Sequence, residues 1–186
     1  TFDIDWAPDF MIDEVRELLV HHQVKATWFV THPSEAVERL RKEPELFELG
    51  IHPNLFPEST QGRDEHTVMK YLKDLLPRAT TMRTHGLIQS TRFLRNSCKN
   101  YGIERDVSLF LPRVQGLQPH RLPLMDCSHW RVPYFWEDDI EMFTRDPIWS
   151  LDDPQLQGEG LKILDFHPAH AVLNTSCYDV YEELKR

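Results

Sequence analysis

Two short apolar segments, Thr1–Asp5 and Leu161–His167, alternate ionisable and apolar residues near their ends. Neighbouring side chains on a β-strand point to opposite faces, so Asp3 and Asp5 would share one face. The same spacing would place the aspartate and the histidine of the second segment together. Barrel enzymes hold carboxylates and imidazoles of this kind at the carboxyl ends of parallel strands. The pattern predicts a hydrolytic enzyme that uses a metal ion.

Three further residues have side chains suited to the same chemistry. His52 ends another apolar segment, and Arg83 and His85 are again two positions apart. Zinc binds histidine nitrogen and carboxylate oxygen, and catalytic zinc sites commonly use three protein ligands with one position left for water. A second carboxylate can deprotonate the water, and a histidine on the opposite side can protonate a leaving amine. An arginine beside the base would hold it ionised and oriented.

These side chains need strands that bring them together. We expect strands at residues 1–5, 25–30, 49–52, 81–85, 106–110 and 161–167. We expect helices at 9–19, 34–42, 64–76, 90–100 and 178–185, with Asp9 and Asp64 as N-caps. Residues 112–158 lack clear periodicity and are expected to form long functional loops. The alternation of strands and helices predicts an α/β fold with parallel strands.

The composition fits one globular domain, residues 1–186, with a sizeable core. A net charge of −9 argues against a nucleic-acid-binding protein, which would carry a basic surface. No apolar segment approaches the roughly 20 residues that span a bilayer. Three scattered cysteines predict reduced thiols and a cytoplasmic protein. Because the sequence starts at Thr1 inside an expected strand, a removed signal peptide or a further N-terminal segment stays open.

Four segments in order carry a family resemblance: Thr1–Asp3, Phe47–His52, Arg83–Gly86 and Ile163–His167. Each alone is weak, but the ordered series resembles the successive motifs of the polysaccharide deacetylase (NodB-homology) family. The resemblance implies a distorted (β/α) barrel with about seven parallel strands. It also implies a divalent metal ion, for which zinc is expected, and the hydrolysis of N- or O-acetyl groups on sugars.

The resemblance implies a role for five residues. Asp3 would be the base, Asp5 the metal-binding acid and His52 a metal ligand. Arg83 would orient the base, and His167 would be the acid that protonates the leaving group. The cofactor would be one divalent ion, and the partner a carbohydrate substrate.

The sequence departs from the family pattern at two places. The family usually has two adjacent acids, whereas Ile4 separates them here. Phe56 stands where the family has its second metal-binding histidine, so the third ligand stays open. His85 is the candidate for this ligand, and Asn54 is a poorer candidate. If Asn54 is not a ligand, it is expected to contact the substrate.

The loops offer candidate substrate contacts. Trp136 lies in Pro133–Asp138, which mixes aromatic and acidic residues as sugar-binding loops do, and would stack on a sugar. Asp165 would contact substrate or orient His167, although an acid of the 126–139 loop is an alternative partner for that histidine. Glu137–Asp139 otherwise reads as a solvated run of charge. Other histidines are expected to be structural: His21, His22, His32, His66 and His120.

The sequence therefore predicts a metal-dependent deacetylase acting on an acetylated sugar, with surface-polysaccharide biosynthesis as its setting. Two alternatives stay open. One is a hydrolase of another amide, such as a formamido sugar or a cyclic ureide, on the same scaffold. The other is a carbohydrate-binding pseudoenzyme with a decayed metal site, which Phe56 would favour.

Overall fold

The computed structural model describes residues 1–184, and its strands form one larger and one smaller sheet. The strands are β1 (Phe2–Asp3), β2 (Ala26–Val30), β3 (Phe47–Ile51), β4 (Thr81–Met82), β5 (Arg105–Phe110), β6 (His120–Leu124), β7 (Cys127–Tyr134), β8 (Trp136–Glu137) and β9 (Leu164–Asp165). The helices are α1 (Asp9–His21), α2 (Glu35–Arg41), α3 (Glu65–Leu75), α4 (Thr91–Tyr101), α5 (Asp138–Glu141), α6 (Pro168–Leu173) and α7 (Tyr178–Leu184). Residues His85–Leu87 form a short 3₁₀ turn.

The larger sheet has the order β1-β2-β3-β4-β5-β7-β6, and all neighbours are parallel except β6 and β7. The smaller sheet is the parallel pair β8-β9. It adjoins β1 on one side, because Phe2 pairs with Phe166 and Asp3 N donates to Phe166 O over 3.0 Å, and on the other side the chain runs from β7 into β8 through Phe135. The α/β fold with mostly parallel strands is thus confirmed. Together the two sheets form the wall of a distorted barrel.

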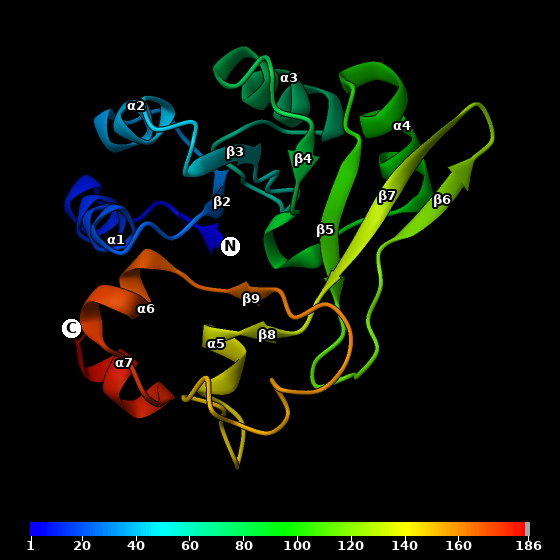
Figure 1. Cartoon of the computed structure of the whole chain (residues 1–186). Coiled ribbons are helices and arrows are strands. Elements are labelled where there is room, and N and C mark those ends of the chain that lie inside the picture. Colours follow the sequence, from blue (N-terminus) through cyan, green and yellow to red (C-terminus); the bar gives the residue numbers. More distant parts are fainter. Residues whose placement is uncertain (185–186) are drawn as a thin grey trace.

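Helices α1 to α4 cover the outside of this wall, and each buries one apolar face. Helix α1 buries Ile12, Val15 and Leu19, and α3 buries Val68, Met69 and Leu72. Figure 1 shows α1, α2, α3 and α4 around the strands in chain order, with the β6–β7 hairpin extending to one side. No helix within residues 1–184 has the length and apolar character needed to cross a membrane.

Several expected elements differ from the structure. Pro8 is the N-cap of α1, whereas the Asp9 carboxylate accepts a bond from Ala36 N. Asp64 caps α3 as expected, with its side chain accepting from Thr67 N over 2.8 Å. The expected loop region 112–158 contains the β6–β7 hairpin, because paired strands can form from sequence without strict alternation. Helix α7 was expected to reach Lys185, which lies outside the described residues.

The strand that was expected to position both Asp3 and Asp5 is shorter than predicted. Strand β1 ends at Asp3, and Asp5 and Trp6 have left-handed φ values of 36° and 58°. Asp5 therefore reaches the barrel mouth through a turn, and strand alternation was the wrong reason for placing it beside Asp3. Backbone conformations of this kind are costly in residues other than glycine, and they concentrate at functional sites.

Candidate active site

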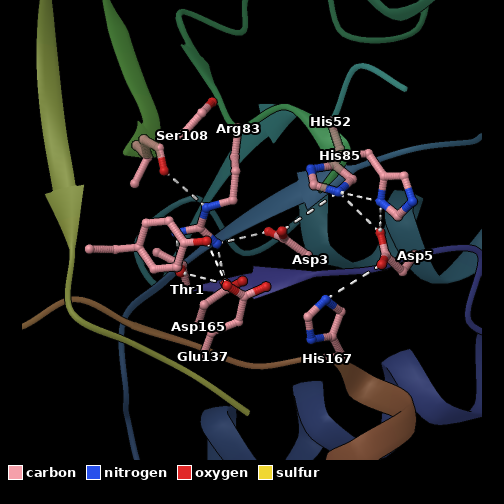
Figure 2. A network of polar contacts seen from close by, with 12 residues as sticks. Thr1, Asp3, Asp5, His52, Arg83, His85, Ser108, Glu137, Asp165 and His167 are labelled. Carbon is pink, nitrogen blue, oxygen red and sulfur yellow. Dashed lines mark hydrogen bonds and ion pairs between the residues drawn. The ribbon is translucent and has the colours of Figure 1, made fainter. Parts of the chain in front are cut away.

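The ionisable residues singled out in the sequence gather where the parallel strands end (Figure 2). Asp3 is the last residue of β1, and His52 directly follows β3. Arg83 directly follows β4, and His167 lies two residues beyond β9. Parallel strands place their carboxyl ends at one rim of the barrel, so residues far apart in sequence meet there.

Three donor atoms lie close together at the centre of this rim. Asp5 Oδ1 is 3.0 Å from His52 Nε2 and 3.1 Å from His85 Nδ1, and the two nitrogens are 3.3 Å apart. Bonds of about 2.0–2.1 Å from zinc to nitrogen or oxygen place tetrahedral ligands roughly 3.3 Å from each other. The three atoms thus already have the separations of a zinc site, and their types fit zinc.

This group of three atoms is open on one side. The side chains of Asp5 and His85 are 28% and 27% exposed, whereas that of His52 is 2% exposed. An ion held here would keep a position open toward solvent, as catalytic sites do. Phe56 packs edge-on against His85, with ring centroids 5.8 Å apart.

The surrounding histidines keep Asp5 ionised. Burial by itself would raise the pKa of Asp5, but hydrogen bonds from His167, His52 and His85 outweigh it and hold the pKa well below its usual range. Burial lowers the pKa of His52, yet the charges of Asp3 and Asp5 reverse this effect and raise it. The local field is therefore strongly negative and favours a cation.

Arg83 holds Asp3 in a buried network. Its Nη1 donates to Asp3 Oδ1 over 2.9 Å and also pairs with Asp165, and its Nη2 donates to Thr1 Oγ1 over 3.0 Å. The guanidinium lies between the rings of Phe29 and Tyr134, 4.7 and 4.3 Å from their centroids. Asp3 consequently has one oxygen fixed by an arginine.

The other oxygen of Asp3 faces the three donor atoms. Asp3 Oδ2 lies 3.6 Å from His52 Nε2. A base in this position can accept a proton from a water molecule located at the open side of the group. Figure 2 shows Asp3 between Arg83 and the histidine pair.

His167 approaches Asp5 from the opposite direction (Figure 2). Its Nε2 is 3.4 Å from Asp5 Oδ2, and its Nδ1 bonds Asp138 Oδ1 over 2.6 Å. The His167 backbone N also donates to Asp138 Oδ2 over 2.7 Å. Burial lowers the pKa of His167, but the bonds to Asp138 and Asp5 raise it well above its ordinary value. The surroundings of His167 therefore favour its protonated form.

Two expectations about acids near His167 need correction. Asp165 is fully buried and bound to Arg83 and Thr1, so it contacts neither substrate nor His167 Nδ1. The acid that orients His167 comes from the 126–139 loop, the alternative left open in the sequence. Glu137–Asp139 is not a solvated run, because Asp138 is buried and Glu137 Oε2 bonds Tyr134 Oη over 2.6 Å.

Two proposed substrate contacts also lie differently from the prediction. Trp136 is only 4% exposed, and its Nε1 donates to Ile148 O over 2.9 Å, so its ring cannot stack on a sugar. Asn54 is half-buried and uses its Oδ1 to accept from Phe56 N over 3.0 Å. It stabilises the loop after β3 and is not one of the three clustered donors.

Sequence reasoning overlooked Trp6. This residue is 36% exposed, and its ring meets His85 edge-on with centroids 5.3 Å apart. Its position directly after Asp5 was the available signal. Trp6 and Phe56 together flank His85 at the mouth of the site.

Comparisons with known proteins agree with this geometry. A family model described as WbmS-like polysaccharide deacetylase matches residues 1–185. Among solved structures, the chain is similar to a Bordetella bronchiseptica protein described as a candidate polysaccharide deacetylase involved in O-antigen biosynthesis, with 34% identity and a TM-score of 0.86. The match covers 99% of this chain and 76% of the other. No functionally curated protein matches the chain significantly.

Proposed function

Because the chain belongs to the WbmS-like polysaccharide deacetylases, hydrolases of carbon–nitrogen bonds, we propose that it removes an acetyl group from an N-acetylated sugar with the help of a divalent ion. One observation carries this proposal. The donors Asp5, His52 and His85 cluster between an Arg83-bound carboxylate and an aspartate-bound histidine. Zinc is the ion that fits these donors best.

Asp5 Oδ1, His52 Nε2 and His85 Nδ1 would hold the ion. When bound, such an ion lowers the pKa of water and polarises the substrate carbonyl. Asp3 accepts the proton of the attacking water through the oxygen that Arg83 leaves free. Arg83 orients Asp3 for this step, because its Nη1 donates to the other oxygen of the carboxylate.

His167 completes the reaction from the other side of Asp5. Oxygen of water adds to the acetyl carbon, and the carbon–nitrogen bond then breaks as the nitrogen takes a proton from His167 Nε2. Asp138 holds the imidazole through Nδ1 and stabilises its charged form. The products are acetate and an amino sugar, which takes up the proton that acetic acid releases. The proton held by Asp3 returns to His167 through solvent, and this restores both groups.

The similar structure supports a proposal for the setting of the reaction. That protein is described as involved in O-antigen biosynthesis, and we propose a related surface-polysaccharide setting for this chain. The alternative that Phe56 marks a decayed site loses its main support, because His85 supplies a third donor. A formamido sugar would fit the same groups and differs in the acid that is released.

The test measures acetate and formate released from N-acetylated and N-formylated amino sugars by the purified protein. Release of acetate should depend on zinc, stop with a chelator and return when zinc is added back. The Asp3→Asn variant serves as the inactive control. Release of formate alone would support the alternative substrate. No release of either acid from a zinc-loaded protein would contradict the proposal.

A further inference from the structure

We propose that the groove beside Phe56 binds a second, uncharged sugar unit of the substrate, next to the unit that carries the acetyl group. This inference rests on the proposed deacetylase function and concerns the loop after β3 together with the start of α3 and α4. It assigns Phe56 a binding function where the family motif would have a metal ligand.

Phe56 lies at the boundary between the donor cluster and the groove. One edge of its ring meets His85, yet the residue remains 44% exposed. An exposed aromatic ring at this distance from the reacting group can pack against the C–H face of a neighbouring sugar. The ring supplies contact area at a small cost in side-chain entropy.

The surrounding residues fix the position of this ring. Asn54 Oδ1 accepts from Phe56 N over 3.0 Å and so holds the backbone of the loop. Gly86 has a φ of 58°, and a Cβ there would lie 2.6 Å from Phe56 Cε2 and 2.8 Å from Cζ. Glycine at this position allows the turn and leaves room for the ring of Phe56.

A groove of about 360 Å³ continues from Phe56. It runs between the loop after β3 and the segment before α4. Its lining includes Asn54, Phe56, Arg63, Asp64, Glu65 and Gln89. Its volume lies within the range of about 300–1,000 Å³ that is typical of ligand sites. Because Phe56 contacts His85, a sugar in the groove would be adjacent to one at the donor cluster.

The polar groups of the groove disfavour an anionic ligand. Arg63, Asp64 and Glu65 line the same groove, so the net charge of the three is negative. Gln89 Nε2 donates to Ser108 O over 2.9 Å, and its buried Oε1 has no hydrogen-bond partner among the described residues. A sugar hydroxyl that reaches this oxygen would donate to it, whereas a carboxylate could not.

The test measures binding, so that it does not depend on turnover. Affinities of the zinc-loaded protein are measured by calorimetry for N-acetylglucosamine, for its β1,4-linked disaccharide and for a disaccharide of N-acetylglucosamine with glucuronic acid. The parent protein should bind the neutral disaccharide about tenfold more tightly than the monosaccharide. Phe56→Ala should reduce this advantage about three- to tenfold, as expected for one lost aromatic contact.

Phe10→Ala is the matched control, because Phe10 is exposed on α1 away from the groove. It should bind all three sugars as the parent does. Zinc content is measured in each variant. An equal loss of affinity for both neutral sugars together with lost zinc would make Phe56 a support for His85 and overturn the inference. No preference for the neutral disaccharide, or tighter binding of the acidic one, would overturn it as well.

The same samples separate this inference from the proposed function. A preference for the neutral disaccharide without acetate release would support the groove and contradict deacetylase activity. Acetate release without this preference would support deacetylase activity and contradict the binding of a second sugar in the groove.

Discussion

Asp3 and Asp5 lie two residues apart, yet the structure gives them different surroundings. Asp3 is buried against the Arg83 guanidinium, whereas Asp5 is partly exposed among three imidazoles. A carboxylate that is fixed by an arginine suits proton transfer, and one surrounded by imidazoles suits metal binding. This difference supports the proposed roles, with Asp3 as the base and Asp5 as the metal ligand, although Ile4 separates the two acids.

The first prediction tests the base. Asp3→Asn keeps the shape of the side chain and removes the proton acceptor, so acetate release should fall by ~10²–10⁴-fold. Zinc should remain bound, because the three proposed ligands are intact. Asp5→Asn is the comparison and should lose zinc. Loss of zinc from Asp3→Asn, with zinc retained by Asp5→Asn, would mean that the two residues have exchanged roles.

The second prediction concerns the partner of His167. Asp138→Asn removes the charge that holds His167 protonated, so turnover of the amide should fall about 10- to 100-fold. The loss should be smaller for an activated ester, because its leaving group departs as an anion without protonation. Rates for both substrates are compared in the parent and the variant, with exposed Asp152→Asn as control. An equal loss on both would assign Asp138 to folding or substrate positioning.

At the scale of elements, apolar segments of the sequence predicted most strands and helices of the barrel. They did not predict the elements and contacts that depend on how strands pair. The strand of Ala26–Val30 and the helix capped by Asp64 follow from local patterns. The β6–β7 hairpin does not, because its strands carry mixed polar and apolar residues. The meeting of Asp138 with His167, 29 residues apart, depends on the pairing of β8 with β9. From the sequence alone, the acid that bonds His167 could be placed only within the 126–139 loop.

The β6–β7 hairpin carries the third prediction. His129 on β7 is 1% exposed, and neither ring nitrogen has a hydrogen-bond partner within the described part of the chain. Burial, with the nearby Arg131, lowers the pKa of His129 to about 4. The unfolded chain therefore binds this proton more readily, and stability should fall as the pH falls from about 6.5 to about 4.

His129→Leu should flatten this dependence. Denaturant midpoints are measured at pH 7.5 and at pH 5, and the parent should lose more stability between them than the variant. His120→Leu is the matched control, because His120 is exposed on the neighbouring strand β6. The same loss in the parent and in His129→Leu would contradict the assignment.

For the molecule as a whole, contacts between residues near opposite ends of the sequence hold the two sheets of the distorted barrel together. Asp3 N donates to Phe166 O, and the rings of Phe2 and Phe166 stack with centroids 5.6 Å apart. Arg83 links β1, β5 and β9 through Asp3, Val107 O and Asp165. We propose that the chain unfolds as one domain, because these bonds tie both ends of the barrel to its middle.

The fourth prediction tests this closure. Arg83→Met keeps much of the side-chain volume between the two aromatic rings but leaves Asp3 and Asp165 without their positive partner. Removing one member of a buried ion network costs about 3–5 kcal/mol, so the free energy of unfolding should fall by that amount. Arg92→Met, at an exposed position on α4, is the control and should change it little. Equal stability of both variants would mean that Arg83 acts only on the base.

The central claim is that Asp5, His52 and His85 hold a catalytic metal ion. Anomalous diffraction at the zinc absorption edge, from crystals of the zinc-loaded protein, tests it most directly. We expect one peak about 2.0–2.1 Å from Asp5 Oδ1, His52 Nε2 and His85 Nδ1. A peak elsewhere, a peak that His85 does not contact, or no peak at all would contradict the account.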